Sequence, residues 1–302
     1  MSASAPMVSV IMPLYNTERH LPAALDSVLG QTFTDFEIIA VDDGSKDGTL
    51  AILRDYEERD SRLRVVSRPN TGIVGALNDG LALARGEFIA RMDGDDLCLP
   101  ERFARQIDHL RNNPQCVLVG SQVLLIDPDG APICPHTQTR FSHEEIDHDH
   151  LNRGWPVIHP SVMMRRQAVE KVGGYREEYK WLEDHDLFLR LAEIGCLANL
   201  PEVLLKYRLH FQSVCHTRVD IQGPLKQKLY EETRKRRGAA AADGAYKLPA
   251  SRSESEVHRM WAWWALKAGN VATARKHALK TVAHAPFSGE SWRIMACAVR
   301  GH

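Results

Sequence analysis

The residues of this chain that could do chemistry gather in two acidic clusters. The first lies in "FIARMDGDDLCLPE" (88–101), where Asp93, Asp95 and Asp96 follow an apolar run. At about 6 Å and an effective dielectric constant of about 20, two carboxylates repel each other by roughly 3 kcal/mol. A divalent cation offsets this repulsion, and Mg²⁺ or Mn²⁺ takes one or two carboxylates and completes its shell with phosphate oxygens and water. The cluster predicts a metal site, with a solvated acidic turn as the alternative.

The second cluster is "VDDGSKDGT" (41–49), which closes another apolar run. An aspartate at the end of a buried strand can accept hydrogen bonds from a nucleotide base or a ribose hydroxyl. The alternative is a pair of Asp-Gly turns with no ligand. The chain has neither GxxxxGK[ST] nor GxGxxG, so neither a P-loop nor a dinucleotide-binding fold is supported.

Alternating strands and helices position these clusters. Apolar strands are predicted at 8–16, 36–43, 63–67 and 87–93, and amphipathic helices at 17–32, 47–60 and 72–86 lie between them. Asn16 or Thr17 is the expected N-cap of the first helix. This alternation predicts a parallel sheet covered by helices on both faces, and such sheets bind ligands beyond the carboxyl ends of their strands. Pro13, Tyr15 and Asn16 should therefore meet both acidic clusters at one edge.

The remainder of the chain divides into two parts. A helix is predicted at 100–114, one or two strands at 116–130, an irregular His-rich segment at 131–180, a helix at 181–195 and a strand at 201–210. After about residue 220 a charged helix runs into an Ala/Gly linker. A tetratricopeptide-like helix pair then follows around Gly269-Asn270 and ends at Pro286. We expect a catalytic domain at 1–218 and a helical region at 219–302.

Composition narrows the function classes. With 302 residues, 44% hydrophobic content and a formal net charge of -1, the chain has a globular composition and no overall field that would draw it to nucleic acid. Six scattered cysteines without a CxxC pair favour reduced thiols in a cytosolic protein. The N-terminus lacks a signal-peptide pattern, and the longest apolar stretch falls short of the ~18 residues that cross a bilayer. We expect a cytoplasmic protein, at most peripheral at the inner face of the membrane.

Six motifs in order resemble those of the family-2 inverting glycosyltransferases of GT-A fold. They are "VSVIMPLYN", "VDDGSKDGT", "GEFIARMDGDD", "HPSVMMRR", "EDHDLFLRL" and "YRLHFQSV", and they span roughly residues 7 to 215. The resemblance implies an α/β fold with a mostly parallel sheet flanked by helices, followed here by the α-helical extension. No QxxRW motif or membrane helix follows "EDHD", so we expect one sugar to be transferred per encounter.

The resemblance also implies roles for individual residues, which fall into four groups. Asp184 would be the general base, with Glu183 and Asp186 as competitors, and Asp95 would ligate Mn²⁺ or Mg²⁺ with Asp93 and His210. The nucleotide would contact Pro13, Tyr15, Asn16, Asp43, Gly72 and Asp93. The donor or the acceptor would contact Asp96, His159, Asp186 and Arg208. The partners implied are a nucleoside-diphosphate sugar, most often uridine-linked in such relatives, and a saccharide or lipid-linked saccharide acceptor.

Several alternatives stay open from the sequence alone. His143, His148 and His150 suggest a zinc site or a solvated loop. "TRKRRG" with Trp261, Trp263 and Trp264 suggests a peripheral membrane contact, or else tryptophans that pack the hairpin against the catalytic domain. The C-terminal helices would also suit a homodimer. The rival functions are a nucleotidyltransferase that makes a nucleotide sugar and a catalytically silent nucleotide-sugar-binding scaffold.

Overall fold

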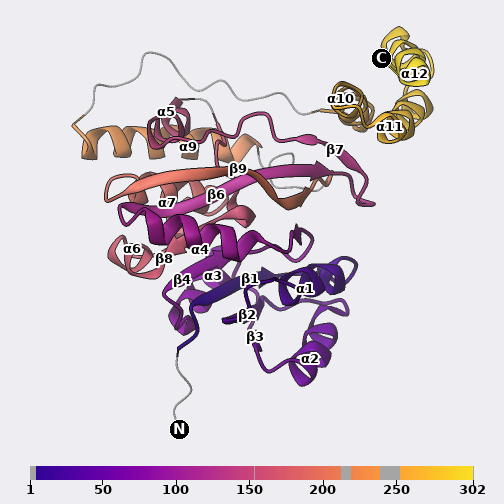
Figure 1. The fold of residues 1–302 in the computed structure, drawn as a ribbon. Helices are drawn as coiled ribbons and strands as arrows, with labels where there is room; N and C mark the ends of the chain where they lie inside the picture. The colour runs from indigo at the N-terminus through magenta and orange to yellow at the C-terminus, as the bar shows by residue number, and fades with distance from the viewer. Residues whose placement is uncertain (1–4, 153, 212–218, 239–251, 302) are drawn as a thin grey trace.

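The computed structural model describes residues 5–152, 154–211, 219–238 and 252–301, and it contains one nine-stranded sheet with helices around it (Figure 1). The strands are β1 (Val8–Leu14), β2 (Phe36–Asp42), β3 (Leu63–Ser67), β4 (Phe88–Arg91), β5 (Leu97–Cys98), β6 (Cys116–Ile126), β7 (Pro132–Pro135), β8 (Met163–Arg165) and β9 (Cys196–Arg208). The helices are α1 (Leu21–Leu29), α2 (Thr49–Arg59), α3 (Ile73–Leu83), α4 (Arg102–Asn112), α5 (His143–Asn152), α6 (Arg166–Lys171), α7 (Glu183–Leu191), α9 (Val219–Arg236), α10 (Glu254–Lys267), α11 (Val271–His284) and α12 (Gly289–Arg300).

The sheet is parallel in its N-terminal half and mixed beyond it. Its strand order is β3-β2-β1-β4-β8-β6-β9-β5, with β7 paired to β6. β1, β2, β3 and β4 pair in parallel, as the sequence predicts, and their carboxyl ends meet at one edge. The short antiparallel strand β8 joins this half to β6, which runs parallel to β9. The α/β fold class is confirmed.

Alternate side chains of the central strands point to opposite faces of the sheet, and a hydrophobic core lies on each face. Val10 and Met12 of β1 are fully buried in a cluster with the apolar faces of α1 and α4. Ile11, between them, is buried on the opposite face with residues of α3, α6 and α7. Successive side chains of a strand point to opposite faces, so a strand that is apolar throughout requires helices on both sides.

Three local predictions differ from the structure. Helix α1 begins only at Leu21 with His20 as its N-cap, because Pro22 at the start of a helix suits its first turn, so neither Asn16 nor Thr17 is the cap. The segment 131–180, predicted as irregular, contains β7, α5, β8 and α6. Strand β9 begins at Cys196, five residues before the predicted start, because it pairs with the whole length of β6.

The C-terminal region forms two units. α9 packs on the catalytic part, where Leu229 and Tyr230 share a buried cluster with Tyr179 and Leu189. α10, α11 and α12 form a separate helical group beside β7. The predicted pair of helices is present, and α12 is a third helix that the sequence analysis did not foresee. We therefore propose that the domain boundary falls after α9 rather than at residue 218.

The tryptophans of α10 pack inward. Trp261 is fully buried and contacts Phe211, with 5.0 Å between the ring centroids, while Trp263 and Trp264 are half-buried against the same core. These three rings therefore fix α10 to the rest of the chain and are not free to enter a membrane.

The basic run "TRKRRG" at the end of α9 is largely neutralised within the protein. Arg236 donates hydrogen bonds to Glu193 at 2.7 to 2.9 Å, and Arg237 donates to Asp147 at 2.7 and 2.9 Å. The two guanidinium groups therefore bind carboxylates of α5 and the α7–β9 turn instead of a lipid surface.

Five cysteines within the described residues are free thiols, namely Cys98, Cys116, Cys134, Cys196 and Cys297, while Cys215 lies outside those residues. Burial raises the pKa of the Cys116 thiol to about 11. None of the helices in the described part of the chain is long and apolar enough to span a membrane.

Candidate active site

The loops that follow β1 and β2 are tied together at the carboxyl edge of the sheet. Asn16 has a φ of 52°, donates its backbone N–H to Ser45 Oγ at 3.0 Å and accepts the Lys46 N–H on its side-chain oxygen at 2.8 Å. Tyr15 beside it is 46% exposed, so its ring is available for stacking. Pro13 lies within β1 and is half-buried. Pro13, Tyr15 and Asn16, which are predicted to contact the nucleotide, thus lie together at the carboxyl edge of the sheet.

Asp43 joins the end of β2 to the start of α3. Its two carboxylate oxygens accept the backbone N–H groups of Thr71 at 3.1 Å and Gly72 at 2.8 Å, and the side chain is buried. Gly72 has a φ of 101°, and a Cβ placed there would lie 2.3 Å from Lys180 Nζ. Only glycine suits this position. Arg68 Nε also lies 3.5 Å from Asp43 Oδ1. A carboxylate has about four lone-pair sites, and the contact of Asp43 with a base stays a prediction.

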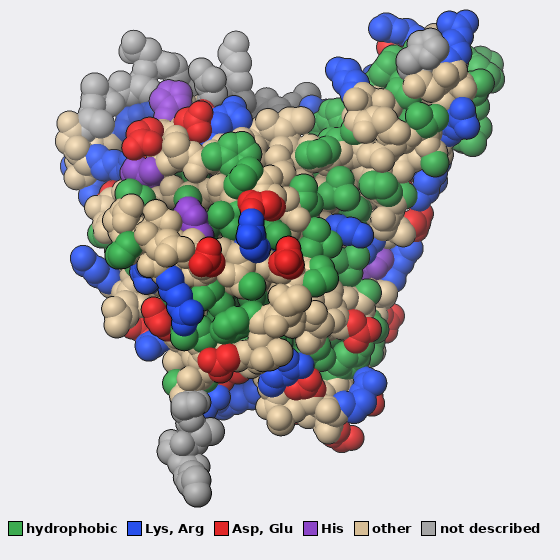
Figure 2. Space-filling model, in the orientation of Figure 1, with side chains coloured by type: hydrophobic (Ala, Val, Ile, Leu, Met, Phe, Trp, Pro, Cys, Tyr) green, Lys and Arg blue, Asp and Glu red, His purple; other side chains and the backbone are tan. Residues whose placement is uncertain are grey.

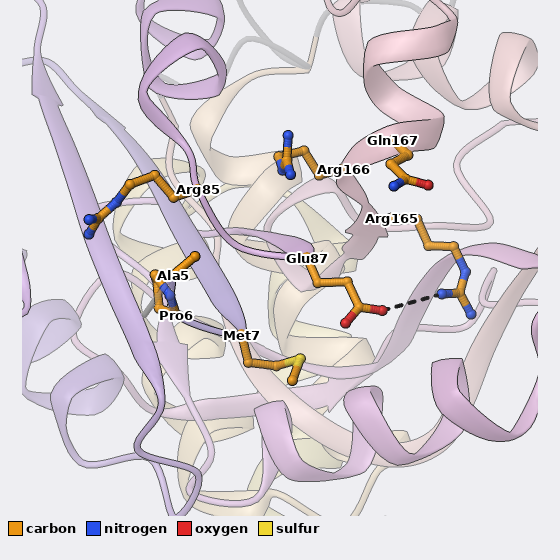
Figure 3. A pocket seen from close by; sticks show the side chains of 8 residues that line it. All are labelled: Ala5, Pro6, Met7, Arg85, Glu87, Arg165, Arg166 and Gln167. Atoms are coloured by element: carbon orange, nitrogen blue, oxygen red, sulfur yellow. Dashed lines mark ion pairs between the residues drawn. The ribbon is translucent and has the colours of Figure 1, made fainter. Parts of the chain in front are cut away.

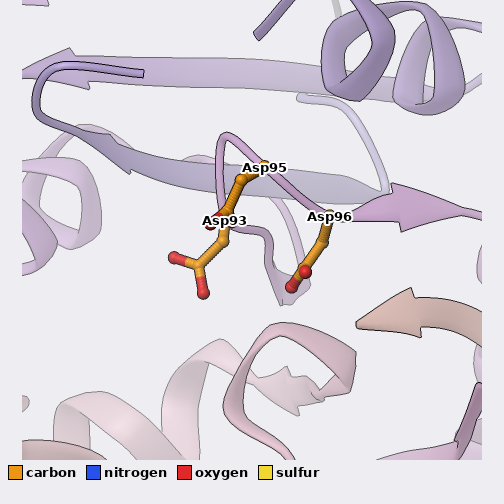
Figure 4. Close-up of side chains that lie close together, drawn as sticks. All are labelled: Asp93, Asp95 and Asp96. Atoms are coloured by element: carbon orange, nitrogen blue, oxygen red, sulfur yellow. The ribbon is translucent and has the colours of Figure 1, made fainter. Parts of the chain in front are cut away.

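The three acids after β4 lie on one loop (Figure 4). Asp93, Asp95 and Asp96 each offer a carboxylate oxygen, and these oxygens lie within 4.8 Å of one another. Within the ranges that the structure describes, this is the one group of three or more His, Cys, Asp or Glu residues close enough to share a metal ion. Hard carboxylate oxygens are the ligands that Mg²⁺ and Mn²⁺ prefer, so the donor set fits the predicted cation.

The end of β9 holds this loop in place. The Arg208 N–H donates to Asp96 Oδ1 and its Nε to the Asp95 carbonyl oxygen, both at 2.7 Å. His210 Nε2 lies 2.7 Å from Asp95 Oδ2. His210 therefore sits beside the predicted ligand, while Arg208 orients the loop through its backbone. Arg208 is buried, and these hydrogen bonds tie the end of β9 to the acidic loop.

Arg91 is a residue of the site that the sequence analysis missed. It is the last residue of β4, its side chain is buried, and it forms an ion pair with Asp93. Burial raises the pKa values of Glu183 and Asp184, and the positive charge of Arg91 opposes part of that rise. The sequence signal available was an arginine at the end of an apolar run, two residues before an acidic cluster, in "ARMDGDD".

The predicted base lies at the first turn of α7. Glu183 is buried, and burial followed by the neighbouring charge of Asp184 raises its pKa to about 8. Asp184 is half-buried, its Oδ1 accepts the His185 N–H at 2.7 Å, and burial also raises its pKa. Two adjacent carboxylates with raised pKa values suit proton transfer near neutral pH.

Asp186 does not face the site, and we correct its predicted role. The side chain is fully buried, Arg190 Nη2 lies 2.6 Å from Asp186 Oδ2, and Arg176 Nε donates to both oxygens at 3.1 Å. With both oxygens engaged by two guanidinium groups, Asp186 stabilises α7 and is not available as a base or as a donor or acceptor contact.

His159 is buried against Tyr175. Its Nε2 is 2.8 Å from the Tyr175 hydroxyl oxygen, and the ring is 7% exposed. Burial, and then the charge of Arg91, lowers its pKa well below the usual value, so the ring is neutral. A predicted contact of His159 with donor or acceptor would have to use this small exposed edge.

Several buried polar atoms in these elements lack hydrogen-bond partners. They include Arg91 Nε, Asp96 Oδ2 and Glu183 Oε2. A buried polar atom without a partner costs roughly 1–3 kcal/mol, so folded proteins seldom keep several in one region. These atoms belong to the loop after β4, the end of β4 and the start of α7, where a polar ligand would supply partners, although similar atoms also occur elsewhere in the described chain, for example at Trp261 and Ser291.

Within its described residues, the His-rich segment does not form the zinc site that the sequence suggested as one alternative. His143, His148 and His150 lie on α5, where His143 Nδ1 accepts the Leu197 N–H at 3.2 Å and the His150 ring packs 4.6 Å from that of His185. They are therefore part of a helix rather than of a zinc site or a flexible loop.

A hollow at the amino ends of β1 and β4 is lined by Arg85, Arg165 and Arg166 (Figure 3). Arg85 pairs with Glu37, and Arg165 donates to the Cys116 carbonyl oxygen at 2.9 Å, while Arg166 pairs with Glu170. Its arginines already have partners, and it lies at the edge of the sheet opposite to the acids.

Comparison of this chain with known proteins identifies the family to which it belongs. The sequence model described as "Glycosyl transferase family 2" matches residues 9–173. The amylovoran biosynthesis glycosyltransferase AmsE of Erwinia amylovora is 35% identical over 206 residues, which cover 67% of this chain and 76% of that protein. The chain belongs to glycosyl transferase family 2, and it is therefore a glycosyltransferase.

Two solved structures share the fold. TarS 1-349 of S. aureus in complex with UDP-GlcNAc has a TM-score of 0.60 at 17% identity, covering 98% of this chain and 92% of that one. The mannosyltransferase PcManGT of Pyrobaculum calidifontis, in complex with GDP-Man and Mn²⁺, has a TM-score of 0.57 at 17% identity, covering 99% and 86%. The predicted GT-A fold is confirmed.

Proposed function

We propose that this glycosyltransferase moves a single sugar, with inversion, from a nucleoside-diphosphate sugar to a saccharide or lipid-linked saccharide acceptor. The observation that carries the proposal is that one buried arginine, Arg91, acts electrostatically on two groups of carboxylates, one in the loop after β4 and one at the start of α7. Asp93, Asp95 and Asp96 follow β4, Glu183 and Asp184 begin α7, and the buried cation of Arg91 acts on both groups.

The donor would bind at the rim formed by the loops after β1, β2 and β4. Tyr15 would stack on the base against Pro13, and Asp43 would accept from the base while Asn16 and Gly72 shape the loops around it. Asp95, with Asp93 and His210, would hold Mn²⁺ or Mg²⁺. When bound, such a cation neutralises the diphosphate and stabilises the charge that develops on it as it leaves.

The start of α7 would supply the base. The acceptor hydroxyl would give its proton to Asp184 as its oxygen forms a bond to the anomeric carbon and the bond to the diphosphate breaks on the opposite side. This single displacement inverts the anomeric configuration. Asp184 is the first choice because it is half-buried and reachable, whereas Glu183 is buried beside it, where burial and then the charge of Asp184 raise its pKa to about 8.

The pathway and the base of the donor are also proposals. The name of AmsE connects that relative with the biosynthesis of amylovoran, and this supports a role in surface polysaccharide synthesis. The two similar structures hold different donors, UDP-GlcNAc and GDP-Man, so the fold allows either base. We propose a uridine-linked donor as the first to test.

The test separates donor binding from transfer. Calorimetry with UDP-, GDP-, dTDP- and CMP-sugars and Mn²⁺ should find one nucleotide class that binds. Asp95→Asn should abolish metal-dependent binding, while Asp108→Asn, an exposed acid of α4, should leave it unchanged. Asp184→Asn should retain donor binding and lose at least a hundredfold in turnover.

Each outcome has a definite meaning. Unchanged binding by Asp95→Asn would remove Asp95 as a metal ligand, and normal turnover by Asp184→Asn would move the base to Glu183. Release of pyrophosphate from a nucleoside triphosphate would instead indicate a nucleotidyltransferase. Donor binding by the wild-type protein with no transfer under any condition would favour the silent scaffold.

A further inference from the structure

The exposed apolar side chains of this protein gather at its C-terminal end. Six large apolar residues are exposed within the described ranges, and four of them lie between residues 279 and 299. Phe287 is 101% exposed, Trp292 56%, Val299 57% and Leu279 56%. We call these four residues the apical patch. Exposed aromatic rings concentrated in a short stretch mark an interaction surface.

The segment that contains these helices has a net positive charge, whereas the rest of the chain has a net negative charge. Residues 252–302 contain eight Lys and Arg against three Asp and Glu, a formal charge of +5. The whole chain carries -1, so residues 1–251 carry -6. Lys and Arg side chains are prominent on this end of the molecule, among apolar ones, at the upper right of Figure 2.

Charge and apolar surface are interleaved within the patch. Three of its four members are followed directly by a basic residue, in Leu279-Lys280, Trp292-Arg293 and Val299-Arg300. On α12, Trp292, Ala296 and Val299 are exposed at positions i, i+4 and i+7, which share one face of a helix. The opposite face, with Ser291, Ile294 and Ala298, is buried. α12 thus has a buried face that packs on the other helices and, opposite to it, an exposed apolar face.

The patch is held in place rather than left loose. Trp292 Nε1 donates to the Pro286 carbonyl oxygen at 2.8 Å, which keeps the indole beside the turn that carries Phe287. Arg275 of α11 donates to the Ala298 and Val299 carbonyl oxygens at 3.0 and 2.9 Å and so fixes the end of α12. A preset surface loses little conformational entropy when it binds.

The other side of the helical group is already occupied. Lys276 and His277 of α11 contact Asp127 at 2.5 and 3.1 Å, and Asn270 donates to the Ile133 carbonyl oxygen at 2.9 Å. These contacts fix the group to β7 and to the end of β6. The apical patch is therefore on a part of the helices that this attachment does not use.

We propose that the apical patch is a docking surface for the face of an anionic lipid bilayer. Aromatic and aliphatic side chains with interleaved Lys and Arg are the composition that inserts into a headgroup region while binding acidic lipids. A second copy of this chain is the less favourable occupant, because pairing the patch with itself would bring together the like charges of Lys280, Arg293 and Arg300 from both copies.

Vesicle sedimentation tests this proposal without donor, metal or acceptor, so its result is independent of the proposed function. The full chain should sediment with phosphatidylcholine vesicles that contain about one third phosphatidylglycerol, weakly with pure phosphatidylcholine, and less at high salt. Phe287→Ser with Trp292→Ser should lower the partition coefficient by at least about tenfold. Arg293→Gln with Arg300→Gln should lower it by about fivefold for each charge removed.

Matched controls exclude general effects of exposure and charge. Phe141→Ser, a 44% exposed ring of the catalytic part, should leave sedimentation unchanged, as should Arg54→Gln with Arg59→Gln on α2. All variants should unfold at the wild-type temperature. Equal binding to neutral and anionic vesicles, no binding at all, or binding that survives the patch variants would overturn the proposal. So would a lipid-free dimer, seen by light scattering, that becomes monomeric with the patch variants, because it would identify a second copy as the occupant.

Discussion

At the scale of single residues, Arg91 links the two carboxylate groups of the site. Its guanidinium is buried and paired with Asp93, and its charge opposes the rise in pKa that burial imposes on Glu183 and Asp184. A carboxyl group acts as a base only in its ionised form, so this buried cation favours the active form near neutral pH. Arg91 is thus a positioning residue for the proposed base.

Removing that charge should shift the pH dependence of the reaction. In Arg91→Met the pKa values of Glu183 and Asp184 should rise, because the cation that lowers them is gone. The acid limb of the profile of kcat/KM should then move to higher pH, with a loss of roughly tenfold or more at pH 7. Arg91→Lys, which keeps a charge, should restore part of the wild-type limb. An equal loss at every pH would show that Arg91 acts on structure alone.

At the scale of elements, a buried cluster of polar groups attaches α11 to the end of β6. Asp127 is fully buried, and its Oδ2 accepts from Lys276 Nζ at 2.5 Å and lies 3.1 Å from His277 Nε2. Burial raises its pKa, but the hydrogen bonds from His277 and Lys276 outweigh that effect and hold the pKa below the usual value. The attachment is therefore strongest when the pH lies above the ordinary pKa of an aspartate. It weakens as the pH falls through the lowered pKa of Asp127, because the carboxylate is then protonated.

Neutralising this one carboxylate should loosen the helical group. Asp127→Asn should lower the free energy of unfolding by about 2–3 kcal/mol, because Lys276 and His277 lose their charged partner while the amide still accepts from the chain. Hydrogen exchange should rise in α10 and α11 before it rises in β1. Asp129→Asn is the matched control, since Asp129 also binds Lys276 at 2.7 Å but is half-exposed, and it should cost less than about 1 kcal/mol. Equal effects of the two variants would contradict this account.

At the scale of the whole molecule, local sequence patterns predicted the parallel strands of the sheet well. They predicted the side-chain contacts around the sheet less well. The four parallel strands follow from apolar runs such as "FEIIAVDD", and the order of strands and helices brought the two acidic clusters to one edge. The ion pairs of Asp186 could not be read in advance, because Arg176 lies ten residues away and only the fold brings it back. Arg91 was overlooked for a similar reason, since nothing in a strand pattern marks a charged residue as buried. α12 follows Pro286, where the predicted helix pair ends, and no pattern in the sequence analysis marked it as a further helix.

The proposed site draws on both halves of the sheet, so its ligand should stabilise the molecule as a whole. A nucleoside-diphosphate sugar with Mn²⁺ at a hundred times its dissociation constant should raise the free energy of unfolding by about 2.7 kcal/mol, because it binds the folded chain and not the unfolded one. Removing the metal with EDTA should abolish this gain, and so should Asp95→Asn. A nucleoside monophosphate, which lacks the second phosphate, should stabilise less and without metal dependence. If the full gain persists in EDTA, Asp93, Asp95 and Asp96 hold no cation, and the repulsion between them must be relieved by the ion pair of Asp93 with Arg91 and the contact of Asp95 with His210.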